Sequence, residues 1–166
     1  MINKINKLAK SEFIKVFFNI FESSSWIAEK LYKLKPFDNF EDLSTKILDI
    51  FENTAKENHI KILKAHPDLA NKTKIGSLTA DSKNEQNSAG LDKCTPEEFD
   101  EFQNLNFQYK KKFGFPFIFA VKDKSKLEIL TSFRKRISCD INVEFEEAKK
   151  QVKKIASLRL NEINKK

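Results

Sequence analysis

Apolar residues recur every three or four positions along most of the chain, which is the spacing of one face of an α-helix. The first such stripe includes Phe13 and Phe17, with Ser11 as its candidate N-cap. The serine run at 23–25 breaks this stripe and offers a cap for a second helix, which Pro36 is expected to end. The pattern therefore predicts that the chain opens with two short helices.

Two further helices are expected before residue 68. Asn39 is a plausible N-cap for the third, whose inner stripe includes Leu43. The fourth must end near His66, because Pro67 pushes the residue before it out of the α region. A polar connection over 68–79 follows these helices.

The middle of the chain carries start and stop signals for helices. Residues 82–85 (Ser-Lys-Asn-Glu) have the spacing of a capping box, and Gly90 is a candidate C-terminal stop. Thr95 followed by Pro96 is a stronger start signal, and that helix is expected to run as far as Gly114. The sequence therefore predicts two separate helices in this region.

The segment 115–121 is apolar and interrupted by a proline, so we expect it to be extended rather than helical. Two more helices are expected at 126–139 and 143–164, the second capped by Asn142. The chain has no internal repeat, three glycines and four prolines, which favours long helices. We therefore predict one all-α domain over 1–166, a single compact unit of about seven to nine helices.

Composition restricts the classes of function. Forty per cent of the residues are hydrophobic and sixteen are phenylalanine, so a folded core is expected. The net charge of +7 raises the question of nucleic acid, but 31 basic and 24 acidic residues are mixed along the chain. A basic helical module that binds nucleic acid or an acidic partner therefore stays as the lesser alternative, and neither nucleic acid nor membrane is the expected partner. The most apolar run, 113–121, is far shorter than the roughly twenty residues that a membrane span needs.

The two cysteines show no sign of a metal site. Cys94 and Cys139 lack C-x-x-C spacing and have no neighbouring histidine, so we expect no metal and two reduced thiols. The N-terminal residues also lack the apolar core of a signal peptide. A cytoplasmic protein is therefore expected.

The two histidines have different settings. His59 lies beside Asn58 in a polar stretch and is expected at the surface. His66 lies at the end of a helix, where unpaired carbonyls favour the imidazolium form. It could cap those carbonyls or transfer a proton in catalysis. Position alone favours the cap, since lone histidines are usually structural.

Three further residues have both a structural and a functional interpretation. In a capping box, Glu85 would bond to the backbone of Ser82 and do nothing else, whereas in a site the same helix N-terminus would attract an anion or an oxygen-rich ligand. Arg159 follows Ile155 by four residues and so lies on the inner stripe of the last helix. An inward arginine needs an anionic partner, from the protein or from a ligand, unless its stem reaches solvent. Spacing does not separate these alternatives.

A series of short motifs runs along nearly the whole chain, ending at Leu160. In order they are FESSSWIA (21–28), KPF (35–37), AHPDLA (65–70), SKNEQ (82–86), AGL (89–91), NFQY (106–109), FGFPFIFAV (113–121), Arg136, Glu144 and LRL (158–160). Together and in this order they resemble one family, the 2-oxo-4-hydroxy-4-carboxy-5-ureidoimidazoline (OHCU) decarboxylases. The chain departs from the family pattern at Ser25, Lys35, Asn71 and Cys139, none of them in the expected site.

The resemblance implies an all-helical enzyme, often a homodimer, that converts OHCU to (S)-allantoin in urate breakdown. It implies catalytic roles for His66 and Glu85 and a substrate-binding role for Arg159. The other residues that it places against the small-molecule substrate are Pro67, Ser82, Lys83, Asn84, Gln86, Phe117, Ile118, Phe119, Ala120 and Val121, with Glu85 among them.

The implied reaction suits the residues present. The substrate would lose a carboxylate beside a ring C=N bond that can accept the electrons, so no cofactor is expected. An imidazole can deliver the required proton near neutral pH, and backbone groups of 117–121 could bond to the substrate amides. This hypothesis predicts a pocket that joins His66, Glu85 and 117–121, whereas the binding alternative predicts a continuous basic face. An enzyme of the same fold that acts on another ureide or imidazolone remains a further alternative.

Overall fold

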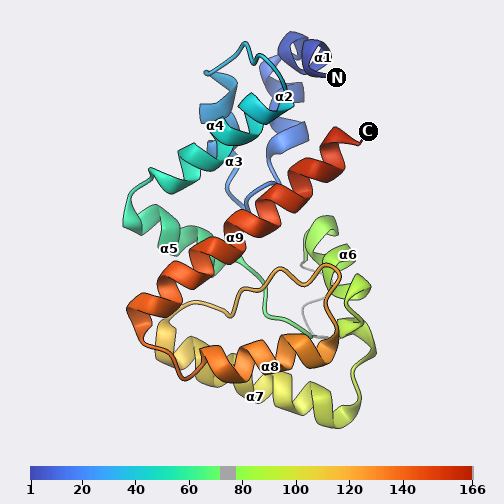
Figure 1. Ribbon diagram of the computed structural model, residues 1–166, viewed down its shortest axis with the longest axis vertical. Helices are drawn as coiled ribbons and strands as arrows, with labels where there is room; N and C mark the ends of the chain where they lie inside the picture. The colour runs from blue at the N-terminus through green and yellow to red at the C-terminus, as the bar shows by residue number, and fades with distance from the viewer. Residues whose placement is uncertain (72–77, 166) are drawn as a thin grey trace. The chain divides into compact units, whose positions relative to one another are not determined.

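The computed structural model describes residues 1–71 and 78–165, which are helical and contain no strand (Figure 1). In chain order the helices are α1 (Ile2–Lys7), α2 (Lys10–Phe17), α3 (Ser25–Tyr32), α4 (Phe40–Glu52), α5 (Lys56–Ala65), α6 (Ala80–Ser88), the 3₁₀ helix η2 (Leu91–Lys93), α7 (Pro96–Phe113), α8 (Lys126–Arg136) and α9 (Ile141–Asn164). The predicted all-α class is confirmed. No helix among these residues is both long and apolar enough to cross a membrane.

The chain divides into two compact units. Unit 1 contains residues 1–65 and 153–166, and unit 2 contains residues 66–152. Helix α9 is continuous and contributes its first half to unit 2 and its second half to unit 1. The expectation of one domain over 1–166 stays a prediction.

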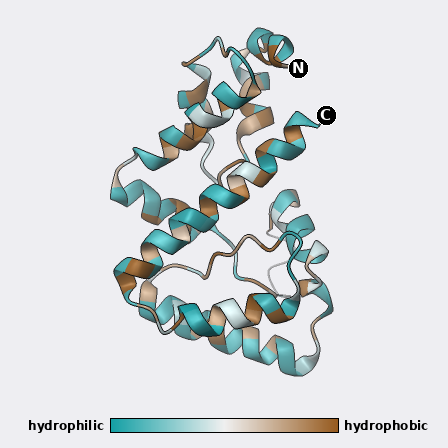
Figure 2. Cartoon of the chain, in the orientation of Figure 1, coloured by the Kyte–Doolittle hydropathy of each residue, from teal (hydrophilic) through white to brown (hydrophobic). Residues whose placement is uncertain are grey.

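Unit 1 is built on phenylalanines that the helical stripes bury. Helix α3 packs against both α2 and α4. The rings of Phe13 and Phe17 lie 4.6 Å apart, and those of Phe21 and Phe51 stack at 4.9 Å. All four are almost fully buried. Figure 2 shows hydrophobic and hydrophilic residues alternating along the helices, as expected when each helix buries one side.

Unit 2 has an aromatic core between α7, α8 and the segment 115–121. Helices α7 and α8 lie side by side (Figure 1). Phe117 stacks on Phe133 at 3.8 Å, and Tyr109 meets both rings edge-on at 5.5 and 5.7 Å. Segment 115–121 is neither helix nor strand, as predicted. Its apolar side chains are held in the core instead.

Several predicted helix ends are confirmed. The Asn39 side chain accepts a hydrogen bond from the Asp42 amide, and Thr95 accepts one from Glu98, so both residues are N-caps. Gly114 ends α7 at φ +78°, a left-handed conformation that glycine adopts without steric cost.

Three predicted caps are wrong, in each case because an earlier residue begins the helix. Ser11 lies inside α2, since the Glu12 carboxylate accepts from the Ala9 amide. Asn142 lies inside α9, and its own amide donates to the carboxylate of Asp140. The third case, at α6, belongs to the candidate site.

Candidate active site

The segment that follows α5 carries His66. This histidine directly follows the last residue of α5 and is 9% exposed, so the predicted helix end before Pro67 is confirmed. Two residues of α6 and α7 hold the backbone beyond it. The Gln86 amide accepts from Ala70 N at 3.1 Å and donates to Asp68 O at 3.3 Å, and Asn106 donates to Leu69 O at 2.9 Å.

Two further features fix this segment. Lys110 pairs with the Asp68 carboxylate at 2.7 Å. Ala70 has φ +56°, a left-handed conformation that a non-glycine residue keeps only when its surroundings hold it there. Helix α7 thus presents Asn106 and Lys110, four residues apart on one face, to the segment after His66. Asn106 therefore makes a long-range contact, to a residue 37 positions earlier in the chain.

Helix α6 carries the second group of candidates. Its N-cap is Thr79, whose hydroxyl accepts from the Ser82 amide at 3.2 Å. The predicted capping box at 82–85 is therefore wrong, because Ser82 is already inside the helix. Ser82 and Gln86 are buried one turn apart, Glu85 is half-buried, and Lys83 and Asn84 are exposed. The interior of unit 2 thus receives the hydroxyl of Ser82 and the amide of Gln86.

The segment 117–121 supplies the third group. Phe117, Ile118, Ala120 and Val121 are buried, and Phe119 is half-buried. The sequence suggested that its backbone groups are available to a ligand, but two of them are bonded within unit 2. Ile118 O accepts from Arg136 at 2.7 Å, and Ala120 N donates to the Gln151 amide oxygen at 3.0 Å.

A buried polar cluster lies behind this segment. The Glu144 carboxylate accepts from the phenol of Tyr109 and pairs with Arg136, whose Nε and Nη2 lie 2.8 and 2.5 Å from the same oxygen. Burial, reinforced by the neighbouring Glu144 carboxylate, raises the pKa of the Tyr109 phenol, so Tyr109 stays protonated as a donor. No function is predicted for this cluster from the sequence, although Arg136 and Glu144 both belong to the motif series.

Arg159 belongs to unit 1 and is 7% exposed. Its Nη1 donates to Asn19 O at 2.7 Å and to the Glu22 carboxylate at 3.1 Å. The prediction that this inward arginine needs an anionic partner is confirmed. The partner is the carboxylate of Glu22.

His59 is buried, so its predicted surface position is wrong. It is 4% exposed, its Nε2 lies 2.7 Å from Phe51 O, and its ring meets the Phe51 ring edge-on at 4.9 Å. The polar residues around it in the sequence face outward from α5, whereas His59 shares the inner face with Ile62 and Leu63. His59 precedes Ile62 by three residues and Leu63 by four, and this helical spacing predicts its burial where the polarity of its neighbours does not.

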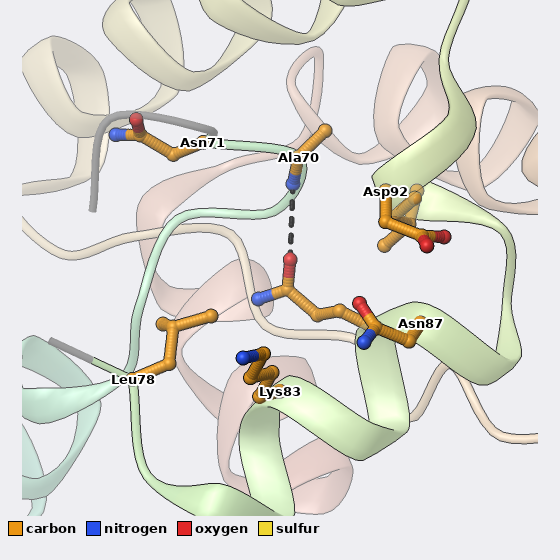
Figure 3. A pocket seen from close by; sticks show the side chains of 8 residues that line it. Ala70, Asn71, Leu78, Lys83, Asn87 and Asp92 are labelled. Atoms are coloured by element: carbon orange, nitrogen blue, oxygen red, sulfur yellow. Dashed lines mark hydrogen bonds between the residues drawn. The ribbon is translucent and has the colours of Figure 1, made fainter. Parts of the chain in front are cut away.

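A small pocket, open to solvent, lies beside α6 (Figure 3). The residues that line it are Ala70, Asn71, Leu78, Lys83, Gln86, Asn87, Leu91 and Asp92. It includes two of the expected binding residues, Lys83 and Gln86. His66, Glu85 and 117–121 are not in its lining, so the pocket that would join them stays a prediction.

Comparison with known proteins identifies the family. The sequence model of the OHCU decarboxylase family matches residues 6–161, nearly the whole chain and both compact units. The chain belongs to the OHCU decarboxylase family.

Relatives and solved structures agree with this family. The chain is 38% identical over 162 residues to a uric acid degradation bifunctional protein of Bacillus sp. (strain TB-90), covering 98% of this chain and 32% of that protein. It is 35% identical to an OHCU decarboxylase of Halalkalicoccus jeotgali, covering 98% of this chain and 90% of the relative. The chain thus spans about a third of the bifunctional relative and most of the shorter one.

Two crystal structures have the same fold as this member of the OHCU decarboxylase family. A structure of (S)-allantoin synthase matches with a TM-score of 0.78 and 27% identity, over 98% of this chain and 54% of that chain. A structure of OHCU decarboxylase solved in the presence of (S)-allantoin matches with a TM-score of 0.75 and 24% identity, over 91% and 99%. At that identity the second comparison shows the fold alone.

Proposed function

We propose that this protein decarboxylates OHCU to (S)-allantoin in urate breakdown. The observation that carries the proposal is the family match over residues 6–161 in a chain that holds a buried histidine at the end of α5. Relatives that the chain covers at 90% or more carry the decarboxylase name. The proposal makes the protein a carboxy-lyase with a small-molecule substrate and no cofactor.

His66 is the proposed acid of the reaction. Loss of CO₂ leaves an electron pair that the ring C=N bond of the substrate accepts, and a proton must then reach one face of the product. An imidazole changes protonation state near neutral pH and suits this transfer. Because Gln86 and Asn106 hold the backbone of residues 68–70, His66 would keep a fixed direction for the proton.

Glu85 is proposed to assist His66, and the other expected residues are proposed to bind the substrate. The proposed binding residues are Pro67, Ser82, Lys83, Asn84, Glu85, Gln86, Phe117, Ile118, Phe119, Ala120, Val121 and Arg159. Support for α6 is its buried polar face, where Ser82 and Gln86 lie one turn apart. Support for Arg159 is the suitability of a guanidinium for gripping a carboxylate with two parallel donors.

The decisive assay follows chirality. Freshly oxidised urate would be incubated with the protein, and the wild type is expected to accelerate the appearance of one allantoin enantiomer. His66→Gln should lose at least about a hundredfold in turnover, a typical contribution of acid–base catalysis. A wild type that leaves the rate and the enantiomer ratio unchanged would overturn the proposal.

His59 provides the matched control for this assay. It is also a buried histidine, but in our proposal it takes no part in the reaction. His59→Gln should lower the melting temperature, because it disturbs the bond to Phe51 O, and should leave turnover per folded molecule unchanged. Equal losses of turnover in both variants would remove His66 from the mechanism.

We also propose that the enzyme is a cytoplasmic homodimer. The dimer is implied by the family resemblance, and the exposed apolar side chains of Phe107 and Val143 are surfaces that a second copy could cover. Cys94 and Cys139 are not joined by a disulfide, which fits a reducing compartment. Light scattering on the purified protein tests the dimer, since a monomeric mass at micromolar concentration would contradict it.

A further inference from the structure

The segment 117–121 is held from two helices through its backbone. Arg136 of α8 donates to Ile118 O at 2.7 Å, and the Gln151 side chain of α9 accepts from Ala120 N at 3.0 Å. All four residues belong to unit 2. The segment is neither helix nor strand, so its backbone groups depend on partners from outside the segment. These two bonds therefore fix the backbone at residues 118 and 120.

The Arg136 contact is itself fixed. Glu144, fully buried, binds Nε and Nη2 of Arg136, which leaves Nη1 for Ile118 O. The guanidinium carbon also lies 4.5 Å from the centroid of the Phe117 ring. A buried ion pair contributes little net stability by itself, because both charges lose their hydration. The Arg136–Glu144 pair does, however, orient the guanidinium that holds the backbone of 117–121.

Gln151 is fixed in a similar way. Its Nε2 donates to Glu147 at 2.8 Å, one turn earlier on α9, so its oxygen is directed to Ala120 N. Because the amide has one donor and one acceptor engaged in opposite directions, its orientation is determined by its two partners. The two helices thus hold a carbonyl and an amide two residues apart in the segment.

We propose that Gln151 and Arg136 are positioning residues. They fix the position of the backbone of 117–121 and thereby determine the affinity for the substrate. This inference rests on the proposed function for the identity of the substrate. The hydrogen bonds to Ile118 O and Ala120 N are observed in the structure and do not depend on the proposed function. Gln151 gives the cleaner test, because it is half-exposed and its replacement leaves the Arg136–Glu144 pair in place.

The experiment compares two glutamines that differ in one contact. Gln151→Met removes the acceptor for Ala120 N and the bond to Glu147. Gln108→Met is the control, since Gln108 also donates to a residue one turn earlier, Asn104, and is exposed. The double variant Glu147→Gln with Gln151→Glu exchanges the carboxylate and the amide between the two positions. The new carboxylate at 151 can accept from Ala120 N and from the new amide at 147, so both bonds can re-form.

Two quantities are measured on each full-length variant. Amide hydrogen exchange at Ala120 should become about fivefold faster in Gln151→Met, because its bond is lost. KM for OHCU should rise about fivefold with kcat nearly unchanged, the fold-change that corresponds to about 1 kcal/mol for one hydrogen bond. The double variant should restore both values, and Gln108→Met should change neither.

The outcomes separate the inference from the proposed function. Unchanged exchange at Ala120, or faster exchange with an unchanged KM in an active protein, would overturn the inference. A wild type without activity on OHCU would instead refute the proposed function, and the exchange measurement alone would then decide whether Gln151 positions the segment. A fall in kcat as large as the rise in KM would show general damage rather than positioning, and would also overturn the inference.

Discussion

The Glu22–Arg159 pair allows the structural and ligand-binding roles of Arg159 to be measured separately. Both side chains are almost fully buried, at 4% and 7% exposure. Removing one partner of a buried ion pair costs about 3–5 kcal/mol, because the other charge is left without compensation. The amide in Glu22→Gln still accepts a hydrogen bond, so we expect the lower limit, about 3 kcal/mol. At roughly 2–4 °C per kcal/mol for a chain of this size, the melting temperature should fall by about 6–12 °C.

Arg159→Lys should be milder. Lysine keeps the positive charge but offers a single point, so it cannot reproduce every contact of a planar guanidinium, among them those to Asn19 O and Glu22. We expect a loss of about 1 kcal/mol, or about 2–4 °C. If Arg159 also grips the substrate with two donors, this variant should bind (S)-allantoin about tenfold more weakly, a change of about 1.4 kcal/mol.

A pair of the same chemistry at the surface is the control. Arg134 makes two bonds to Glu101, at 2.6 and 2.8 Å, and is half-exposed. The bond from Arg134 lowers the pKa of the Glu101 carboxyl, but solvent screens such pairs, so Arg134→Lys should lower the melting temperature less than Arg159→Lys does. Thermal unfolding and calorimetric titration with allantoin measure both effects. A lower melting temperature with unchanged allantoin affinity in Arg159→Lys would refute the ligand-binding role, and no change in either would refute the pair as well.

The remaining predictions concern α6. Glu85→Gln should keep the melting temperature within about 2 °C of the wild type and lose most of the turnover, because the amide retains the shape without the charge; an active variant would exclude Glu85 from catalysis. Thr79→Ala should destabilise the protein by about 1 kcal/mol through loss of the N-cap, which chemical unfolding can measure. Asn84→Ala, at an exposed position on the same helix, should cost less than about 0.5 kcal/mol, and an equal cost at both positions would contradict the assignment of the cap.

Local signals in the sequence were sufficient for much of the fold. Helix α7 begins after Thr95, at Pro96, and ends before Gly114, as predicted. These ends are predictable because helix capping depends on neighbouring residues alone. At α6 the spacing between Ser82 and Glu85 matches a capping box and so predicts Ser82 as the cap. The structure instead places Ser82 three residues inside the helix, where its side chain is buried. Thr79 and Ser82 are both residue types that can cap a helix, and the local sequence does not distinguish them.

The partners of the candidate residues could not be predicted in the same way. The inner stripe of α9 indicated that Arg159 needs an anion, but Glu22 is 137 residues away and no local pattern links the two. The bond between Gln151 and Ala120 spans 31 residues and joins a side chain to a backbone amide, which carries no residue-type signal. Periodicity therefore predicted which residues face inward and left their partners undetermined.

The discontinuity of unit 1 has a consequence for the order in which the protein can fold during synthesis. Residues 153–166, which complete this unit, leave the ribosome after all of unit 2, so unit 2 can fold first even though most of unit 1 is made earlier. Until Arg159 emerges, the buried ion pair between Glu22 and Arg159 cannot form. The N-terminal helices therefore cannot complete unit 1 at this stage, and their apolar faces stay exposed. A nascent chain arrested before residue 159 should be a substrate for chaperones and proteases.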